Sequence, residues 1–222
     1  MKVRYILSVA KKDLRVEFRS KHTINFMFLF SLLTITIFSL ALGFSKVVED
    51  VGAGLLWVIL LFTGMMGVSR AFIREKELGT LEGIRLSPID PESILIGKIV
   101  YNLVLMLLVE IITFLLFIVM LNLHVENIPL AIFVLTLGIF GFVVVCSMLS
   151  VLVLNAKTRE LLLPVILFPI AFPMISVSIH ALRDVFLGSG LSDISGEIVV
   201  LLAYIIIMFT VSFLTFGYAL EG

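Results

Sequence analysis

The sequence predicts an all-α membrane protein: a bundle of six transmembrane helices, an N-terminal amphipathic helix in the membrane interface, and a cytoplasmic helix between spans two and three. Three observations predict this class. Of the 222 residues, 61% are hydrophobic and 14% are charged, whereas an average soluble domain is about half apolar and about a quarter charged. Six stretches are apolar enough to cross the roughly 30 Å of hydrocarbon in a bilayer. Basic residues gather in alternate connections between these stretches.

The composition also argues against other classes. A chain this apolar is not disordered, and its apolar stretches are continuous rather than alternating, unlike the strands of a transmembrane barrel. The single cysteine, Cys146, cannot form an intrachain disulfide, and no Cys/His spacing typical of a metal site occurs. Sixteen basic residues balance sixteen acidic ones. We therefore expect no nucleic-acid partner and no directly bound cofactor.

The spans are expected at about residues 24–44, 51–73, 99–121, 128–154, 161–182 and 198–220. Lys and Arg collect on the cytoplasmic side of membrane proteins. Seven lie before the first span, five in or beside the connection between spans two and three, and two between spans four and five; the opposite connections hold only Lys46 and Arg183. This distribution predicts a multi-pass protein of the cell membrane with both termini in the cytoplasm. No repeat or linker divides the chain, so residues 1–222 are expected to form one domain.

Residues 1–22 predict the amphipathic helix. Apolar side chains share one helical face: Val3, Ile6, Leu7, Ala10, Leu14 and Phe18. Basic side chains fall mostly on the other face: Lys11, Lys12, Arg15 and Arg19. This pattern is typical of a helix lying in the membrane interface. A generic positively charged anchor is the alternative interpretation.

Residues 74–98 form the largest cytoplasmic connection, where contact with a soluble partner is most plausible. One helix is expected through Arg74 to Arg85. Breaks follow at Ser87-Pro88 and at Asp90-Pro91, because proline restricts the preceding residue to extended geometry. Pro91 suits the first position of a second helix, with Asp90 as its N-cap. That second helix is expected to continue into the third span.

The first of these helices has two interpretations. Acidic and basic residues alternate along it, so it is either a solvated face held by weak ion pairs or a short rigid helix that docks into a groove on a partner. In the second interpretation the apolar contacts come from Leu78, Leu81 and Ile84.

The run Arg74-EKELGTLEGIRLSPID, followed by Gly97-Lys98 at the start of a span, closely resembles the signature of exporter-type ABC transporter permeases. The resemblance is closest to the haem exporter B permeases of cytochrome c maturation, the CcmB family, and it includes chain length, six spans and a basic amphipathic N-terminus. The matched positions are Arg70, Phe72, Gly79, Leu81, Glu82, Pro88 and Lys98, with Pro169 and Pro173 in the fifth span.

The resemblance implies a permease homodimer, each subunit docked on a separate cytoplasmic ABC ATPase through the coupling helix between spans two and three. The docking residues it implies are Glu75, Glu77, Gly79, Thr80, Leu81, Glu82, Arg85 and Pro88. The chain lacks a P-loop, since Gly97-Lys98 is followed by Ile99 and Glu92 occupies the upstream glycine position. ATP is therefore expected to act through the partner, and the chain is expected to be a transporter subunit and not an enzyme.

The resemblance also implies haem as the substrate, either translocated or released from a chaperone, and haem-handling membrane proteins as partners. Lipid, polysaccharide, drug and sodium exporters carry similar loops, so a permease for one of these substrates is an alternative. A membrane scaffold without transport of its own is a further alternative.

Polar residues inside the spans are further candidates. An ionised, lipid-facing acid costs roughly 2.5–3.5 kcal/mol at the bilayer centre, so Glu110 in the third span should face the bundle, a subunit interface or water, or be protonated. It is either a proton- or substrate-linked group or a buried hydrogen-bond partner. His180, near the outer end of the fifth span, is either a haem-iron ligand or an interfacial anchor. Pro164, Pro169 and Pro173 interrupt the fifth span, which favours a bend lining a cavity or a static kink.

Overall fold

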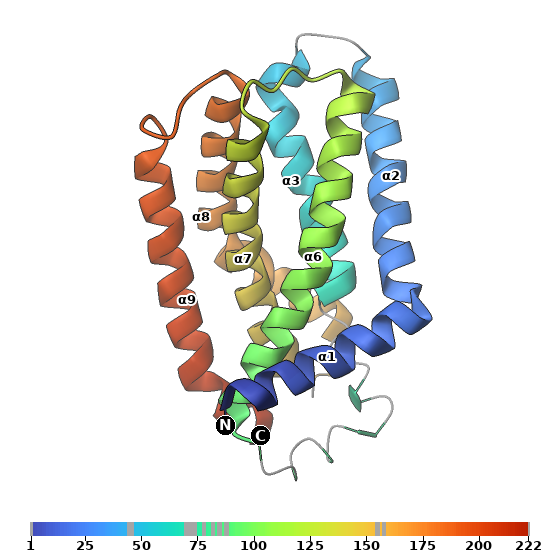
Figure 1. The fold of residues 1–222 in the computed structure, drawn as a ribbon, viewed down its shortest axis with the longest axis vertical. Helices are drawn as coiled ribbons and strands as arrows, with labels where there is room; N and C mark the ends of the chain where they lie inside the picture. The colour runs from blue at the N-terminus through green and yellow to red at the C-terminus, as the bar shows by residue number, and fades with distance from the viewer. Residues whose placement is uncertain are drawn as a thin grey trace.

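The structure describes residues 2–43, 47–68, 89–153 and 159–221, together with residues 75, 76, 79, 80, 83, 86 and 156. In this computed structural model, those residues fold into seven α-helices and contain no strand. Six helices stand side by side and run between the same two ends of the bundle, while α1 lies across one end (Figure 1). Both chain termini lie at that end, which we call the basal end.

The helices follow the chain in order. They are α1 (Lys2–Ser20), α2 (His22–Leu42), α3 (Val47–Val68), α6 (Pro91–Leu121), α7 (Ile128–Leu152), α8 (Arg159–Phe186) and α9 (Ser195–Glu221). Among the described residues, six helices are long and apolar enough to cross a membrane, namely all except α1. They coincide with the six predicted spans to within a few residues at most ends, so the predicted all-α, multi-pass membrane class is confirmed.

α1 passes into α2 through a single residue, Lys21, which adopts the left-handed conformation (φ 53°). Its backbone N–H donates to the carbonyl of Glu17 at 2.6 Å. The N–H of Thr23, in the first turn of α2, donates to the Glu17 carboxylate at 2.8 Å. First-turn N–H groups have no partner within their own helix, so Glu17 stabilises the start of α2. This junction sets α1 across the basal end.

α6 begins at Pro91 with Asp90 at the N-cap position, as the proline pattern predicts. It has 31 residues, which corresponds to roughly 46 Å at about 1.5 Å per residue. This is longer than the predicted span, because the helix extends towards the basal end before the apolar stretch starts. α1 packs across this basal part of α6. A Cβ at Gly97 would lie 2.8 Å from Cβ of Val9 and 3.1 Å from the carbonyl oxygen of Ile6, so the close crossing requires glycine.

α7 lies at the centre of the bundle, in contact with α3, α6, α8 and α9 (Figure 1). Its Gly138 faces Trp57 of α3, whose indole N–H donates to the Ser178 hydroxyl of α8 at 3.1 Å. A Cβ at Gly138 would lie 2.4 Å from the Trp57 ring and 2.8 Å from the Ser178 hydroxyl oxygen. The missing side chain therefore makes room for the contact that joins three helices.

α8 continues through Pro164, Pro169 and Pro173 as one helix, and the expected bend or kink at these prolines stays a prediction. Each proline lacks an N–H and removes one helical hydrogen bond. Next to Pro173, the Tyr204 hydroxyl of α9 donates to the carbonyl of Ile170 at 2.8 Å. This bond from a neighbouring helix gives a backbone carbonyl near the proline a hydrogen-bond donor, as transmembrane helices that contain proline commonly require.

Candidate functional site

Four charged side chains meet at the basal end and form what we call the basal ion cluster: Lys12 and Asp13 of α1, Glu75 of the segment between α3 and α6, and Lys98 of α6. The Lys98 ammonium lies 2.8 Å from Asp13 Oδ2 and 2.8 Å from Glu75 Oε1. The Lys12 ammonium lies 2.8 Å from Glu75 Oε1 and 3.1 Å from Asp13 Oδ1. The cluster therefore joins three segments that are far apart in the chain.

Among the described residues, the cluster balances two cations against two carboxylates, which is what burial of charge requires. The Lys98 side chain is 1% exposed and that of Glu75 is 8% exposed, whereas that of Lys12 is 52% exposed. Burial alone would lower the pKa of Lys12, but its hydrogen bond to Glu75 and the charges of Asp13 and Glu75 outweigh that effect. The pKa of Lys12 is thus raised above its ordinary value of 10.5, and Lys12 is charged at neutral pH.

The face of α1 that enters the protein differs from the face defined by its apolar residues. Glu17 is 1% exposed and Ala10 is 3% exposed, and the Asp13 side chain is also largely buried. Val3 and Leu7 of the predicted apolar face are exposed. Sequence reasoning missed Asp13 and Glu17 as functional candidates. Their spacing is the sequence signal that could have identified them: the only two acids of α1 lie four residues apart, on the same helical face.

The segment between α3 and α6 contains the residues expected to dock an ATPase. Residues 75 and 76 are helical, but Gly79 has φ 68°, so one unbroken helix through Arg74 to Arg85 is wrong. The N–H of Gly79 donates to the Lys76 carbonyl at 3.2 Å, and that of Thr80 donates to the Glu75 carbonyl at 2.9 Å. This pair of bonds with glycine in the left-handed conformation is a Schellman motif, which ends a helix.

The docking candidates divide into three groups. Gly79 and Thr80 are exposed, whereas the Glu75 carboxylate points into the basal ion cluster. The others lie outside the described residues: Glu77, Leu81, Glu82, Arg85 and Pro88. Two further family-matched positions, Arg70 and Phe72, also lie outside the described residues. The docking role stays a prediction for the whole set.

Two polar contacts join α6 to α7 farther along the bundle. The Asn102 amide donates to the Ser147 hydroxyl at 2.9 Å, and the Thr136 hydroxyl donates to Glu110 Oε1 at 3.4 Å. Glu110 is 1% exposed, so its carboxyl group faces the bundle interior, one of the placements expected for it. In the described part of the chain, the other oxygen, Oε2, has no hydrogen-bond partner. Whether Glu110 has a functional role stays a prediction.

The remaining candidates lie on α8. Pro169, Pro173 and His180 are all exposed on its surface, and their spacing of four and seven residues places them on one helical face. Among the described residues, no group of three or more His, Cys, Asp or Glu side chains is arranged to hold a metal ion. A role for His180 as an iron ligand stays a prediction.

Comparison with known proteins adds a family match. The model of the CcmB protein family matches residues 4–222. Heme exporter protein B of Escherichia coli (strain K12) is 27% identical over 92 residues, which are 41% of this chain and 42% of that relative. Heme exporter protein B of Shigella flexneri matches to the same extent. The aligned part thus spans less than half the length of these curated relatives.

Proposed function

This chain belongs to the CcmB family, and we propose that it is the permease subunit of an ABC transporter that handles haem during cytochrome c maturation. It would couple ATP hydrolysis by a separate cytoplasmic ATPase to haem transfer or to the release of a haem-loaded chaperone. The family match over residues 4–222 carries the proposal. The relatives named heme exporter protein B support haem over lipid, polysaccharide, drug or sodium as the substrate.

The basal ion cluster supports a coupling role for the segment between α3 and α6. Glu75 belongs to this segment, and it is bonded to Lys98 of α6 and Lys12 of α1. A partner that pushes on the exposed Gly79 and Thr80 would displace Glu75 and, through it, both helices. Because α1 passes directly into α2 at Lys21, the displacement would reach the first and third spans together. These contacts support a permease whose conformational change starts at its basal end.

The orientation in the cell is part of the same proposal. The positive-inside rule supports a cell-membrane protein whose basal end, with both termini, faces the cytoplasm. The ATPase would then dock at the basal end of a permease homodimer, and haem-handling membrane proteins would bind beside it. Purification of the tagged chain from its native membrane tests this: an ABC ATPase and haem-handling subunits are expected to co-purify. Co-purification with glycan- or lipid-synthesis proteins instead would contradict the haem assignment.

The docking segment has its own test. We expect the double change Leu81→Ala and Glu82→Ala to lower the amount of co-purified ATPase by at least about tenfold, since truncating the central contacts of an interface commonly costs about 2 kcal/mol or more. Leu86→Ala is the matched control, because Leu86 is 86% exposed in the same segment and is not a docking candidate. Equal ATPase recovery from the double variant and the control would contradict the docking assignment.

Glu110→Gln tests the intramembrane carboxyl group. The amide has nearly the same shape and still accepts a hydrogen bond from Thr136, so we expect normal amounts of folded protein. If the proton or charge of Glu110 takes part in the cycle, cytochrome c maturation falls by about tenfold, equivalent to about 1.4 kcal/mol. Thr136→Val is the control, since it removes the hydrogen bond but keeps the carboxyl group. Full activity of Glu110→Gln would leave Glu110 a structural role only.

A further inference from the structure

α1 separates its charges by sign. Its two acids, Asp13 and Glu17, point into the protein, and Lys12 is paired with Asp13 and Glu75 in the basal ion cluster. Four other cations of the helix are exposed: Arg4, Lys11, Arg15 and Arg19. Within the described part of the chain, none of these four forms an ion pair. α1 therefore presents a row of cations without counter-charges.

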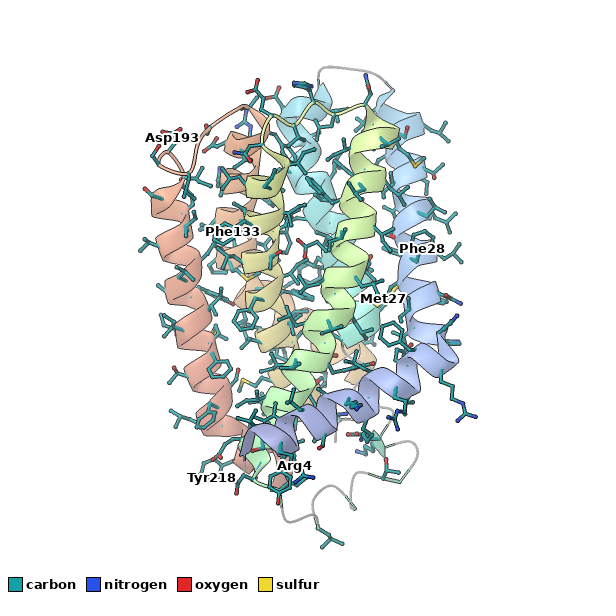
Figure 2. The ribbon with its side chains drawn as sticks, viewed as in Figure 1. Arg4, Met27, Phe28, Phe133, Asp193 and Tyr218 are labelled. Atoms are coloured by element: carbon teal, nitrogen blue, oxygen red, sulfur yellow. The ribbon has the colours of Figure 1, made fainter. Side chains whose placement is uncertain are left out.

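Exposed apolar side chains lie beside this row. Val3 is 68% exposed, Leu7 58% and Phe18 44%. Near the N-terminus, both kinds of residue line one shallow groove of about 470 Å³: Val3, Arg4, Leu7, Ser8 and Lys11. Residues three and four positions apart share a helical face, so the groove runs along the helix. Figure 2 shows Arg4 at the basal end of the bundle.

The position of α1 fixes the depth of this groove in a bilayer. α1 ends one residue before α2, a helix apolar and long enough to span a membrane, so the C-terminal end of α1 lies where the hydrocarbon region begins. The basal ion cluster and the close crossing at Gly97 hold the rest of α1 against α6. An apolar strip next to unpaired cations at this level matches the boundary between acyl chains and phosphate headgroups.

We propose that this face of α1 is a binding site for anionic phospholipids. Arg4, Lys11 and Arg15 contact the phosphate and the net negative headgroup, while Val3 and Leu7 contact the first methylenes of the acyl chains. Zwitterionic lipids carry the same phosphate but no net charge, so they bind more weakly to unpaired cations. The proposal does not depend on haem, on an ATPase or on transport.

An acidic protein surface is the other occupant that the cations would suit. It is less favoured because the exposed Val3, Leu7 and Phe18 would then remain in water beside the contact, whereas a lipid covers both the apolar strip and the cations. α1 also needs no rearrangement to receive a lipid, since its acids already point inward.

Lipid retention by the purified full-length chain tests the proposal. The protein is equilibrated in mild detergent with equal amounts of phosphatidylglycerol and phosphatidylcholine, and the bound lipids are counted by native mass spectrometry. We expect phosphatidylglycerol to be retained preferentially. A Lys or Arg near an anionic surface contributes about 1 kcal/mol, or roughly fivefold. The triple variant Arg4→Gln, Lys11→Gln and Arg15→Gln should therefore lose most of the preference.

The matched control keeps every charge: Arg4→Lys, Lys11→Arg and Arg15→Lys should retain the preference. The unchanged chain gives a second measurement that needs no variant, because raising the salt from about 0.05 M to about 0.5 M should weaken the preference by screening. An equal lipid ratio in the wild type and the glutamine triple variant would overturn the proposal, as would a preference insensitive to salt. If the glutamine triple variant loses a co-purifying acidic protein but keeps the lipid ratio of the wild type, the proposal is overturned in favour of a protein contact.

Discussion

Lys98→Met is expected to lower the free energy of unfolding by about 3–5 kcal/mol, the range found when one partner of a buried ion pair is removed. The change leaves the carboxylates of Asp13 and Glu75, whose side chains are 11% and 8% exposed, with the partly exposed Lys12 as their single remaining cation in the cluster. Methionine nearly fills the space of the lysine side chain, so the loss arises from unbalanced charge and not from a cavity. Unfolding in detergent, followed by the fluorescence of the single tryptophan, Trp57, measures it.

Restoring the charge balance provides the control. Lys98→Met combined with Glu75→Gln leaves Asp13 paired with Lys12, so we expect it to recover much of the lost stability. Arg183→Met is the comparison for an exposed pair: Arg183 lies 2.9 Å from Asp50 with both side chains substantially exposed, and such pairs contribute about 0–1 kcal/mol. If Lys98→Met is no more damaging than Arg183→Met, the basal ion cluster does not hold α1 and α6 together.

Gly138→Ala is expected to destabilise the bundle by about 1–3 kcal/mol, the usual cost of overpacking a core. The added methyl group would lie 2.4 Å from the Trp57 ring and 2.8 Å from the Ser178 hydroxyl oxygen, and Trp57 is 1% exposed, so the ring has little room to move. We expect the hydrogen bond between the indole and Ser178 to break. A shift in the emission of Trp57 in the folded variant would report this directly.

Gly54→Ala in α3 is the matched control, because no atom outside its own helical turn and chain neighbours lies within 4 Å of the position that its Cβ would occupy. It should be neutral or slightly stabilising, since alanine favours a helix over glycine by about 1 kcal/mol. Trp57→Phe combined with Gly138→Ala should recover part of the loss because the phenyl ring is smaller, and its unfolding is followed by circular dichroism because it lacks the single tryptophan. Equal stability of Gly138→Ala and Gly54→Ala would show that the contact between α3 and α7 is looser than the structure indicates.

The helices that the sequence predicted best are those that depend on local composition. Each candidate span is apolar over its own length, and the transfer of such a stretch into hydrocarbon is favourable whatever its neighbours are. The start of α6 at Pro91 is equally local, because it follows from the backbone restrictions that proline imposes. Gly79 shows the limit of this reasoning: the acidic and basic residues around it fit a helix, but its left-handed conformation ends the helix there.

The candidate site was predicted in part. Lys98 and Glu75 were both identified from their place in a family motif, yet nothing in the motif indicates that they bind each other. Asp13 was not identified at all, because an acid on a basic amphipathic helix usually points to solvent. Its partner, Lys98, lies on another helix, and no local periodicity connects them.

The sequence by itself determined that this chain is a six-span membrane protein, that its cations are concentrated in alternate connections, and that its third spanning helix begins at Pro91. Only the tertiary structure decided which charges face inward. Burial of an ion is tolerated only beside a counter-ion, so the position of Lys98 depends on where α1 and the segment containing Glu75 come to lie. That arrangement also leaves Arg4, Lys11, Arg15 and Arg19 of α1 exposed beside an apolar strip, and so creates the surface proposed to bind anionic lipid.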